Sequence, residues 1–305
     1  MSKIEFTHQI AVIGAGVAGL AAATEVARLG LKTALFDDGM LGGLITNVGT
    51  LDGPPNHNGE AGADLVTAML GAALEAAVDY QMGSVAKLTA AGDYWRVSGD
   101  EEVIVPRVIL ATGAQLRHLD VAGEAALMGR GVSQCAFCDG GLYRDKDVVV
   151  VGGGDAAFQE ALHLAEVCAN VTILLRGQAP RARQSFVGKV TGQNNVRLRV
   201  HTDVREIIGD DGVDAVRLYD QSLDAEETMA IDGIFPFVGL APQTTLAPET
   251  TKRDDYGGLI VGADMQTDQN GLYAIGATRS QYGGQVVHAL VDAQTVAQGI
   301  HQAVR

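Results

Sequence analysis

Two cysteines, Cys135 and Cys138, are separated by two residues and followed directly by Asp139. Cysteines at this spacing can close a small disulfide ring, and in such motifs one thiol is commonly acidic enough to be a thiolate near neutral pH. The carboxyl group of Asp139 could give or take the proton when a thiolate forms or leaves. A helix N-cap for the segment from Gly140 onwards is the structural alternative for Asp139, and the two roles are compatible. The segment therefore indicates thiol–disulfide chemistry.

A metal site is the main alternative for a cysteine pair. Structural zinc needs four ligands, and only Cys168 remains, which we expect inside a helix without a second pair. We interpret Cys168 as a buried apolar residue. The seven histidines have no metal-like spacing, so no metal is predicted. A purely structural disulfide is equally disfavoured in a reducing compartment.

Two glycine-rich turns flank the cysteine pair, and the first one opens the chain. A strand is predicted over residues 9–14, a helix follows to Leu29, and a second strand over residues 32–36 ends at Asp37. The turn between the first strand and the helix contains Gly14, Gly16 and Gly19. Such a βαβ unit lets backbone N–H groups approach a pyrophosphate at the positive end of a helix.

The same plan returns after the cysteines. A strand is predicted over residues 147–151, a helix over 158–167 and a further strand over 171–175, ending at Arg176. Its turn contains Gly152, Gly154 and Ala157. One fingerprint is a weak signal, but two in the right context of strand and helix are a strong one.

The residues at the ends of the second strands differ in charge. Asp37 can accept hydrogen bonds from an adenosine ribose and would repel a 2′-phosphate. Arg176 offers a guanidinium to a 2′-phosphate, and Arg181 and Arg183 follow closely. The first site therefore suits FAD, and the second suits NADPH better than NADH. A solvated surface arginine is the alternative interpretation of Arg176.

Hairpin patterns follow each unit, and each hairpin leads into a strand that ends in glycine, at Gly113 and at Gly239. We interpret this as an internal duplication, and the segment 272–276 as a returning strand of the first domain. The predicted fold class is α/β with two Rossmann-like dinucleotide-binding domains, the first discontinuous and the second inserted. The expected boundaries are 1–115 and 244–305 for the FAD-binding domain, and 116–243 for the NADPH-binding domain that carries the cysteines.

The composition sets further limits. The chain has 305 residues, of which 47% are hydrophobic and 19% charged, as in a globular protein with an ample core. Its formal net charge of −15 disfavours nucleic acid and anionic membranes as partners. The first residues show no signal peptide, and the apolar segment 10–23 is too short to span a bilayer. We therefore expect a cytoplasmic enzyme.

With these segments assembled, the chain resembles the low-molecular-weight thioredoxin reductase family of flavoproteins along essentially its full length. The matching segments are 14–19, 42–46, 111–113, 135–139, 152–157 and 271–285. The resemblance implies two domains of the glutathione reductase type, FAD in the first, NADPH in the second, and a homodimer. It implies that Cys138 faces the flavin, that Cys135 attacks a thioredoxin-type disulfide, and that Asp139 is the acid–base residue. Carried over by position, the FAD-binding residues include Gly43, Thr46, Thr112, Gly113, Gly276 and Gln285.

Three positions depart from the family pattern. An acid that binds the flavin ribityl chain is replaced by Ala277, which leaves this task to backbone groups and Arg279. A His-Arg-Arg phosphate clamp appears as residues 175–177, with a single arginine, although Arg181 is retained. A Tyr-Arg pair before Gln285 is replaced by two glycines. Three hypotheses therefore stay open: an NADPH-dependent disulfide reductase, a reductase fed by ferredoxin, and a flavin dithiol oxidase that reduces oxygen to hydrogen peroxide. A flavin-bound redox sensor is the non-enzymatic alternative.

Overall fold

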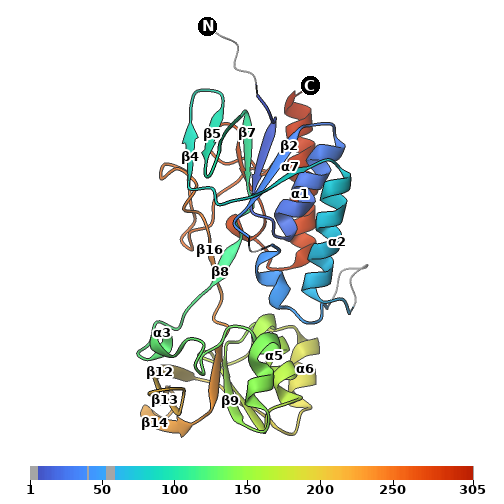
Figure 1. Ribbon diagram of the computed structural model, residues 1–305. Coiled ribbons are helices and arrows are strands. Elements are labelled where there is room, and N and C mark those ends of the chain that lie inside the picture. Colours follow the sequence, from blue (N-terminus) through green and yellow to red (C-terminus); the bar gives the residue numbers. More distant parts are fainter. Residues whose placement is uncertain (1–5, 40, 53–58, 305) are drawn as a thin grey trace. The chain divides into compact units, whose positions relative to one another are not determined.

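The computed structural model describes residues 6–39, 41–52 and 59–304. The chain divides into two compact units: unit 1 comprises residues 1–115 and 241–305, and unit 2 comprises residues 116–240 (Figure 1). The two connecting strands, β8 (Ala114–Leu116) and β16 (Leu240–Pro242), pair with each other. The second boundary lies three residues before the position expected from the sequence, because Gln243 already donates its backbone N–H to Gly113 of unit 1.

Unit 1 contains a five-stranded sheet in the order β17-β7-β1-β2-β3, in which all pairs are parallel. Every residue of β1 and β2 is buried, as is typical of parallel strands covered on both faces. The segment expected to return to this domain does so as β17, which pairs with β7. The strands are β1 (Ile10–Ile13), β2 (Thr33–Asp37), β3 (Asp79–Met82), β7 (Arg107–Leu110) and β17 (Leu272–Ala274).

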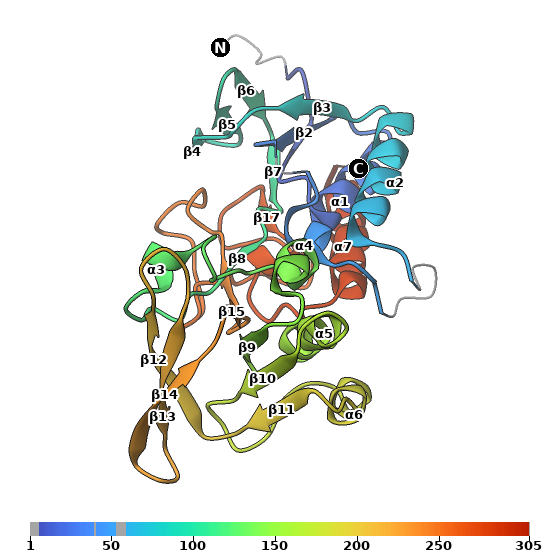
Figure 2. The same cartoon turned by 60° about the horizontal axis from the view of Figure 1, so that its bottom comes forward.

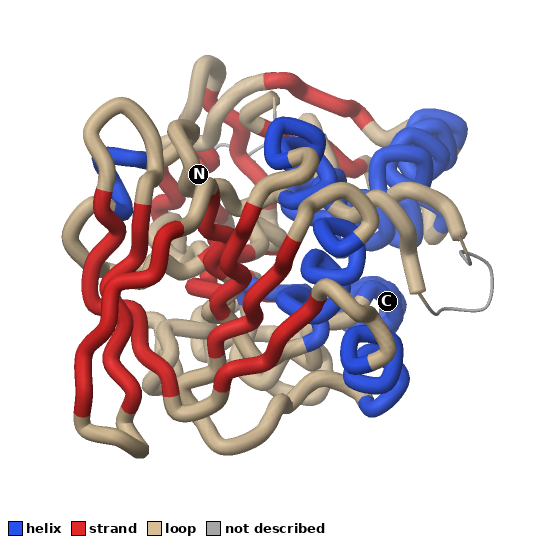
Figure 3. The backbone as a smooth tube through the Cα atoms, turned by 90° about the horizontal axis from the view of Figure 1, so that it is seen from below, coloured by secondary structure: helices blue, strands red, loops and turns tan. Residues whose placement is uncertain are grey.

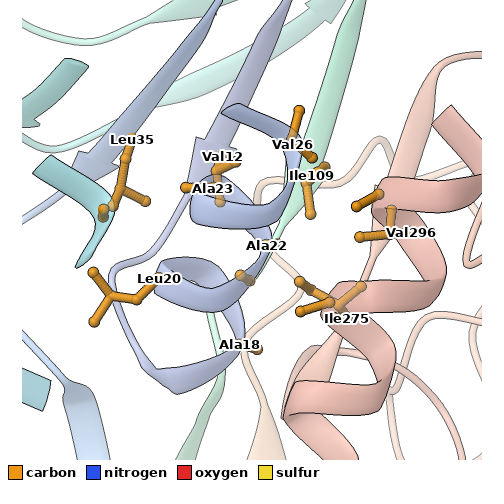
Figure 4. Packing of buried hydrophobic residues seen from close by; sticks show 14 of the residues in the cluster. Val12, Ala18, Leu20, Ala22, Ala23, Val26, Leu35, Ile109, Ile275 and Val296 are labelled. Carbon is orange, nitrogen blue, oxygen red and sulfur yellow. The ribbon is translucent and has the colours of Figure 1, made fainter. Parts of the chain in front are cut away.

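Helices cover one face of this sheet, and a small antiparallel sheet covers the other. Alternate residues of β1 separate the two cores: Ile10 and Val12 pack with the helices, whereas Ala11 and Ile13 pack with the small sheet. Figure 4 shows Val26 of the first helix beside Ile109 of the sheet, and Ala22 on the side of the helix that faces Val296 of the last. The elements are α1 (Val17–Arg28), α2 (Gly62–Glu75), α7 (Val286–Val304), β4 (Lys87–Ala90), β5 (Trp95–Ser98) and β6 (Glu102–Val105), with 3-10 turns η1 (Gly43–Asn47) and η3 (Gly276–Thr278).

Unit 2 repeats this architecture on a smaller scale. Its four-stranded sheet has the order β11-β10-β9-β15 and is parallel. Two helices pack on one face and a three-stranded antiparallel sheet on the other (Figures 2 and 3). The elements are β9 (Asp147–Val151), β10 (Asn170–Leu174), β11 (Val196–Arg199), β12 (Thr202–Ile208), β13 (Ala215–Asp220), β14 (Ala225–Ala230), β15 (Gly233–Pro236), α3 (Glu124–Leu127), α4 (Ala136–Asp139), α5 (Asp155–Ala165), α6 (Gln184–Thr191) and η2 (Gly140–Tyr143).

The two βαβ units and both hairpins lie where the sequence placed them, with small differences at their ends. Helix α5 begins at Asp155 rather than at Phe158, and Cys168 lies beyond the end of this helix rather than inside it. Cys168 is buried, as expected. Strands β4 and β14 extend the hairpins to three strands and were not predicted. None of the helices in the described part of the chain is long and apolar enough to cross a membrane.

Candidate functional site

The two cysteines form a disulfide at the start of a short helix in unit 2. Cys135 precedes α4, Cys138 lies within it, and their Cα atoms are 5.3 Å apart. The backbone N–H of Cys138 donates to the sulfur of Cys135 at 3.1 Å, and the N–H of Asp139 donates to the carbonyl of Cys135. Cys135 is 9% exposed. Backbone hydrogen bonds therefore hold the sulfur of Cys135 in a defined position.

The carboxyl group of Asp139 is held by a buried serine. The hydroxyl of Ser133 donates to Oδ2 of Asp139 at 2.6 Å and accepts the N–H of Cys135 at 3.1 Å. Asp139 lies at the N-cap position of η2, but its side chain makes no capping hydrogen bond there among the described contacts. Ser133 thus links the carboxyl group of Asp139 to the backbone N–H of Cys135.

A second carboxylate touches the same turn and was missed by the sequence analysis. Glu160, on α5, accepts the N–H of Ala136 at 2.8 Å and also a backbone hydrogen bond from Phe137. Burial raises the pKa of Glu160, and these two hydrogen bonds oppose the rise. His163, one turn further along α5, lies against the ring of Phe137 with ring centroids 5.5 Å apart. Helix α5 therefore supports the cysteine turn with two polar side chains.

The glycine turn of unit 1 has the geometry of an anion-binding turn. Gly14 has a φ of +102°, and a Cβ at Gly19 would lie 1.8 Å from the carbonyl oxygen of Gly14, so only glycine fits at position 19. Helix α1 begins after Gly16 without a side-chain cap and without an acid in its first turn, as far as the described residues show. Its first N–H groups are thus open to a pyrophosphate, which the residues present fit.

Asp37 is the last residue of β2 and is 6% exposed. Its carboxylate accepts the N–H of Ala15 at 3.2 Å and the hydroxyl of Tyr80 at 3.5 Å. These two bonds orient the carboxylate and leave acceptor positions for a ribose. Burial raises the pKa of Tyr80, and the charge of Asp37 adds to the rise. A cavity of about 270 Å³ adjoins the end of β2 and is lined by Phe36 and residues 81–85, among others.

The C-terminal part of unit 1 contains a buried ion pair next to Ala277. Asp292, on α7, is 1% exposed; it accepts Nε and Nη2 of Arg279 at 2.7 and 2.8 Å and the N–H of Gly276 at 2.9 Å. The guanidinium of Arg279 is therefore committed to Asp292 and to the carbonyl of Ser280. Through Asp292, Arg279 helps to order the turn at Gly276. This role differs from the contact between Arg279 and the flavin that the sequence led us to expect.

The other residues expected to bind FAD lie in unit 1. The N–H of Gly113 donates to Oγ1 of the fully buried Thr278 at 2.8 Å, and Thr112 donates to the carbonyl of Gln243. Thr46 donates to the carbonyl of Gly43 within η1. Gln285 is exposed just before α7. Gly113 and Gly276 thus border one turn region, since Thr278 and Gly276 belong to the same η3.

The glycine turn of unit 2 lies beside the segment that carries Arg181. Gly152 has a φ of +146°, and α5 begins after Gly154. The backbone N–H of Arg181 donates to Gly153 at 2.7 Å, so the segment carrying Arg181 borders the turn. Arg176 and Arg181 are exposed, whereas Arg183 pairs with Asp155 at 2.6 Å. Ala157 is fully buried, which allows close contact between the helix and the sheet.

Within the described ranges, no group of three or more potential metal ligands exists. Three residues of the site were not found from the sequence: Ser133, Glu160 and Asp292. The only sequence signal for Ser133 was its position two residues before Cys135. Glu160 and Asp292 lie on helices and have no distinguishing sequence feature.

Comparison with known proteins places this arrangement in a family. The family described as pyridine nucleotide-disulphide oxidoreductase matches residues 8–295. A thioredoxin reductase of Listeria innocua is 33% identical over 306 residues, covering 100% of this chain and 96% of the relative. A thioredoxin reductase of Mycolicibacterium smegmatis is 36% identical over 279 residues, covering 90% of each chain. The crystal structure of Lactococcus lactis thioredoxin reductase superposes with a TM-score of 0.95 at 31% identity, covering 98% of this chain and 99% of that chain.

The chain belongs to the pyridine nucleotide-disulphide oxidoreductase family. The glycine turn of unit 1, the second glycine turn and the disulfide are what such an enzyme requires. Within the family, the chain is an FAD-dependent disulfide oxidoreductase of the thioredoxin reductase type.

Proposed function

We propose that this protein reduces the disulfide of a thioredoxin-type protein with electrons from NADPH, using Cys135 and Cys138 as its redox-active pair. The observation that carries the proposal is the Cys135–Cys138 disulfide, beside which Ser133 bridges the backbone N–H of Cys135 and the carboxyl group of Asp139. The relatives named thioredoxin reductase, at 33% and 36% identity, support the choice of substrate.

The chemistry assigned to the cysteines consists of three steps, in which electrons and protons balance. Reduction of their disulfide takes two electrons and two protons and gives two thiols, of which one ionises. The thiolate of Cys135 then attacks the substrate disulfide and releases one substrate thiolate. Cys138 attacks Cys135 in turn, which releases the second substrate thiolate and restores the Cys135–Cys138 bond. Asp139 gives and takes the protons of these steps.

FAD, when bound, supplies two-electron transfer between a nicotinamide and a disulfide. The residues that would hold it are those of unit 1: Gly14, Gly16 and Gly19 around the pyrophosphate, Asp37 at the ribose, and Gly43, Thr46, Thr112, Gly113, Gly276 and Gln285 along the remainder. The open N–H groups at the start of α1 and the oriented carboxylate of Asp37 support this assignment.

NADPH is assigned to unit 2. Gly152, Gly154 and Ala157 would hold its pyrophosphate, and Arg176 and Arg181 its 2′-phosphate. Their exposure and the hydrogen bond that ties Arg181 to Gly153 support this assignment. The first unit is then the FAD-binding domain and the second the NADPH-binding domain. A homodimer in the cytoplasm is proposed from the resemblance to the family.

The test is an anaerobic titration of the purified, FAD-loaded protein with NADPH, followed by addition of oxidised thioredoxin. We expect NADPH to bleach the visible flavin band, and thioredoxin to restore it only when Cys135 and Cys138 are both present. Cys168→Ser, outside the disulfide, is the matched control and should behave as the unmodified protein. No bleaching at millimolar NADPH would refute the proposal. Bleaching by a dithiol and recovery in oxygen, without any nicotinamide, would instead assign a dithiol oxidase.

A further inference from the structure

The cysteine turn has three N–H groups at its start, and their partners are unequal. The N–H of Ala136 and that of Phe137 donate to the carboxylate of Glu160, and the N–H of Cys138 donates to the sulfur of Cys135. A thiolate is stabilised by N–H donors and by positive charge, and is destabilised by a neighbouring anion. The arrangement thus places an anion where donors to the sulfur could otherwise act.

We propose that Glu160 is a positioning residue that sets the ionisation of Cys135: its carboxylate takes two of the three N–H groups and keeps the thiol from ionising too readily. The inference deepens the proposed function and rests on it only in taking Cys135 as the attacking thiol. Glu160 reaches the turn from α5, the helix that follows the glycine turn of unit 2.

Burial strengthens the effect of this charge. Glu160 is partly buried, and burial is the main cause of its raised pKa. Two unit charges about 7 Å apart, at an effective dielectric constant of about 30, change a pKa by about one unit. The sign is clear: a negative carboxylate disfavours the thiolate and raises the pKa of the thiol, so its removal lowers that pKa.

Other titratable groups also face the turn. They are Asp139 on the turn itself, His163 on α5 and Tyr143 at the end of η2. The carboxyl group of Asp139 accepts a hydrogen bond from Ser133, and burial raises the pKa of Tyr143. Because the variants proposed below leave all three unchanged, a difference between variants reports on position 160 alone.

The experiment measures the rate at which iodoacetamide alkylates Cys135, as a function of pH, in the full-length FAD-loaded protein. Cys138→Ser provides the background in which Cys135 cannot form the internal disulfide, and mass spectrometry of the peptide identifies the modified residue. Glu160→Gln removes the charge and keeps an acceptor. Glu166→Gln, the exposed acid just after the same helix, is the matched control.

We expect Glu160→Gln to lower the midpoint of the alkylation profile by about one unit. The rate at pH 7 should rise about three- to fourfold rather than tenfold, because a thiolate of lower pKa is a weaker nucleophile. Glu166→Gln should leave the profile unchanged, and Glu160→Asp, which keeps the charge, should restore most of the original midpoint. If Glu160→Gln does not fold, Glu160→Met serves as the second neutral variant, with the same expected direction.

Equal midpoints in Glu160→Gln and Glu166→Gln would overturn the inference, and so would a raised midpoint in Glu160→Gln. A midpoint lowered equally by Glu160→Asp would also overturn it, since shape rather than charge would then be responsible. The alkylation needs neither NADPH nor thioredoxin. A failure of NADPH to bleach the flavin would therefore count against the proposed function and leave this measurement valid.

Discussion

Replacing Asp292 by asparagine should destabilise unit 1 far more than an equal change at an exposed ion pair. Asp292 is 1% exposed, and the side chain of its partner Arg279 is 15% exposed. Removing one partner of a buried pair leaves the other charge uncompensated, which costs about 3–5 kcal/mol. Asparagine still accepts the N–H of Gly276, so we take the lower end, about 3 kcal/mol. In a domain of this size that lowers the melting temperature by about 6–12 °C.

The control is Glu102→Gln, whose partner Arg96 is also in unit 1. Its N–O distance is 2.7 Å, equal to that between Arg279 and Asp292, but its side chains are 42% and 49% exposed. Solvent screening leaves an exposed pair with little contribution to stability. The expected shift of the melting temperature is therefore small and well below that of Asp292→Asn. The two pairs have the same N–O distance, and they differ in burial and in the number of hydrogen bonds that the carboxylate accepts.

The assay is thermal unfolding of both variants without FAD, followed by circular dichroism and calorimetry, so that cofactor binding does not add stability. The transition of unit 2, where resolved, is the internal reference. A double variant, Arg279→Met with Asp292→Leu, should recover most of the loss, because no unpaired charge then remains. Equal melting temperatures for Asp292→Asn and Glu102→Gln would refute the reasoning.

Three further predictions concern other parts of the chain. Burial raises the pKa of the Cys168 thiol to about 11. Ellman's reagent should therefore detect no thiol in the folded, oxidised protein, one thiol after denaturation, and three thiols after denaturation and reduction. Rapid labelling of the native protein would contradict this. Arg181→Ala should raise the KM for NADPH about 10–100-fold, as expected for the loss of a charged hydrogen bond. The control Arg205→Ala, which removes an arginine stacked on Tyr219, should leave this KM unchanged. Equal effects of the two variants on the KM in steady-state kinetics would argue against the 2′-phosphate assignment. Gly19→Ala should abolish FAD retention, because its Cβ would meet the carbonyl of Gly14. Gly71→Ala, with open space around its Cβ, should retain FAD and be neutral or stabilising by up to about 1 kcal/mol. The visible flavin absorbance of the two purified proteins tests the difference in FAD retention.

The elements that could be predicted from the sequence are those whose pattern is local. Strand β1 and residues 148–151 of β9 are uninterrupted apolar runs, and the glycines that directly follow them, Gly14 and Gly152, have positive φ values. Strand β14 escaped prediction because five of its six residues are exposed, so it has no alternating pattern. It is a strand because β13 offers it a partner.

The candidate site divides in the same way. The spacing of Cys135, Cys138 and Asp139 is visible in the chain, but Glu160 becomes relevant only because α5 packs beside the cysteine turn. The sequence around Ala277 likewise did not reveal the tertiary partner of the neighbouring Arg279. From the sequence, the carboxylate lost at Ala277 seemed to leave Arg279 free for the flavin, yet Asp292, from a distant helix, occupies that guanidinium. Tertiary partners of a charged side chain have no local signature.

The divided sequence of unit 1 has a consequence for synthesis on the ribosome. Strand β17 and helix α7 lie C-terminal to the whole of unit 2, so β7 lacks its outer neighbour, and Ile10 and Val12 lack part of their cover, until the last segment emerges. Unit 2 can complete its own sheet earlier, because its strands are contiguous in the chain. In the nascent protein, unit 2 is therefore folded while the sheet of unit 1 is still incomplete. The unpaired edge of β7 is then the surface at which aggregation would begin.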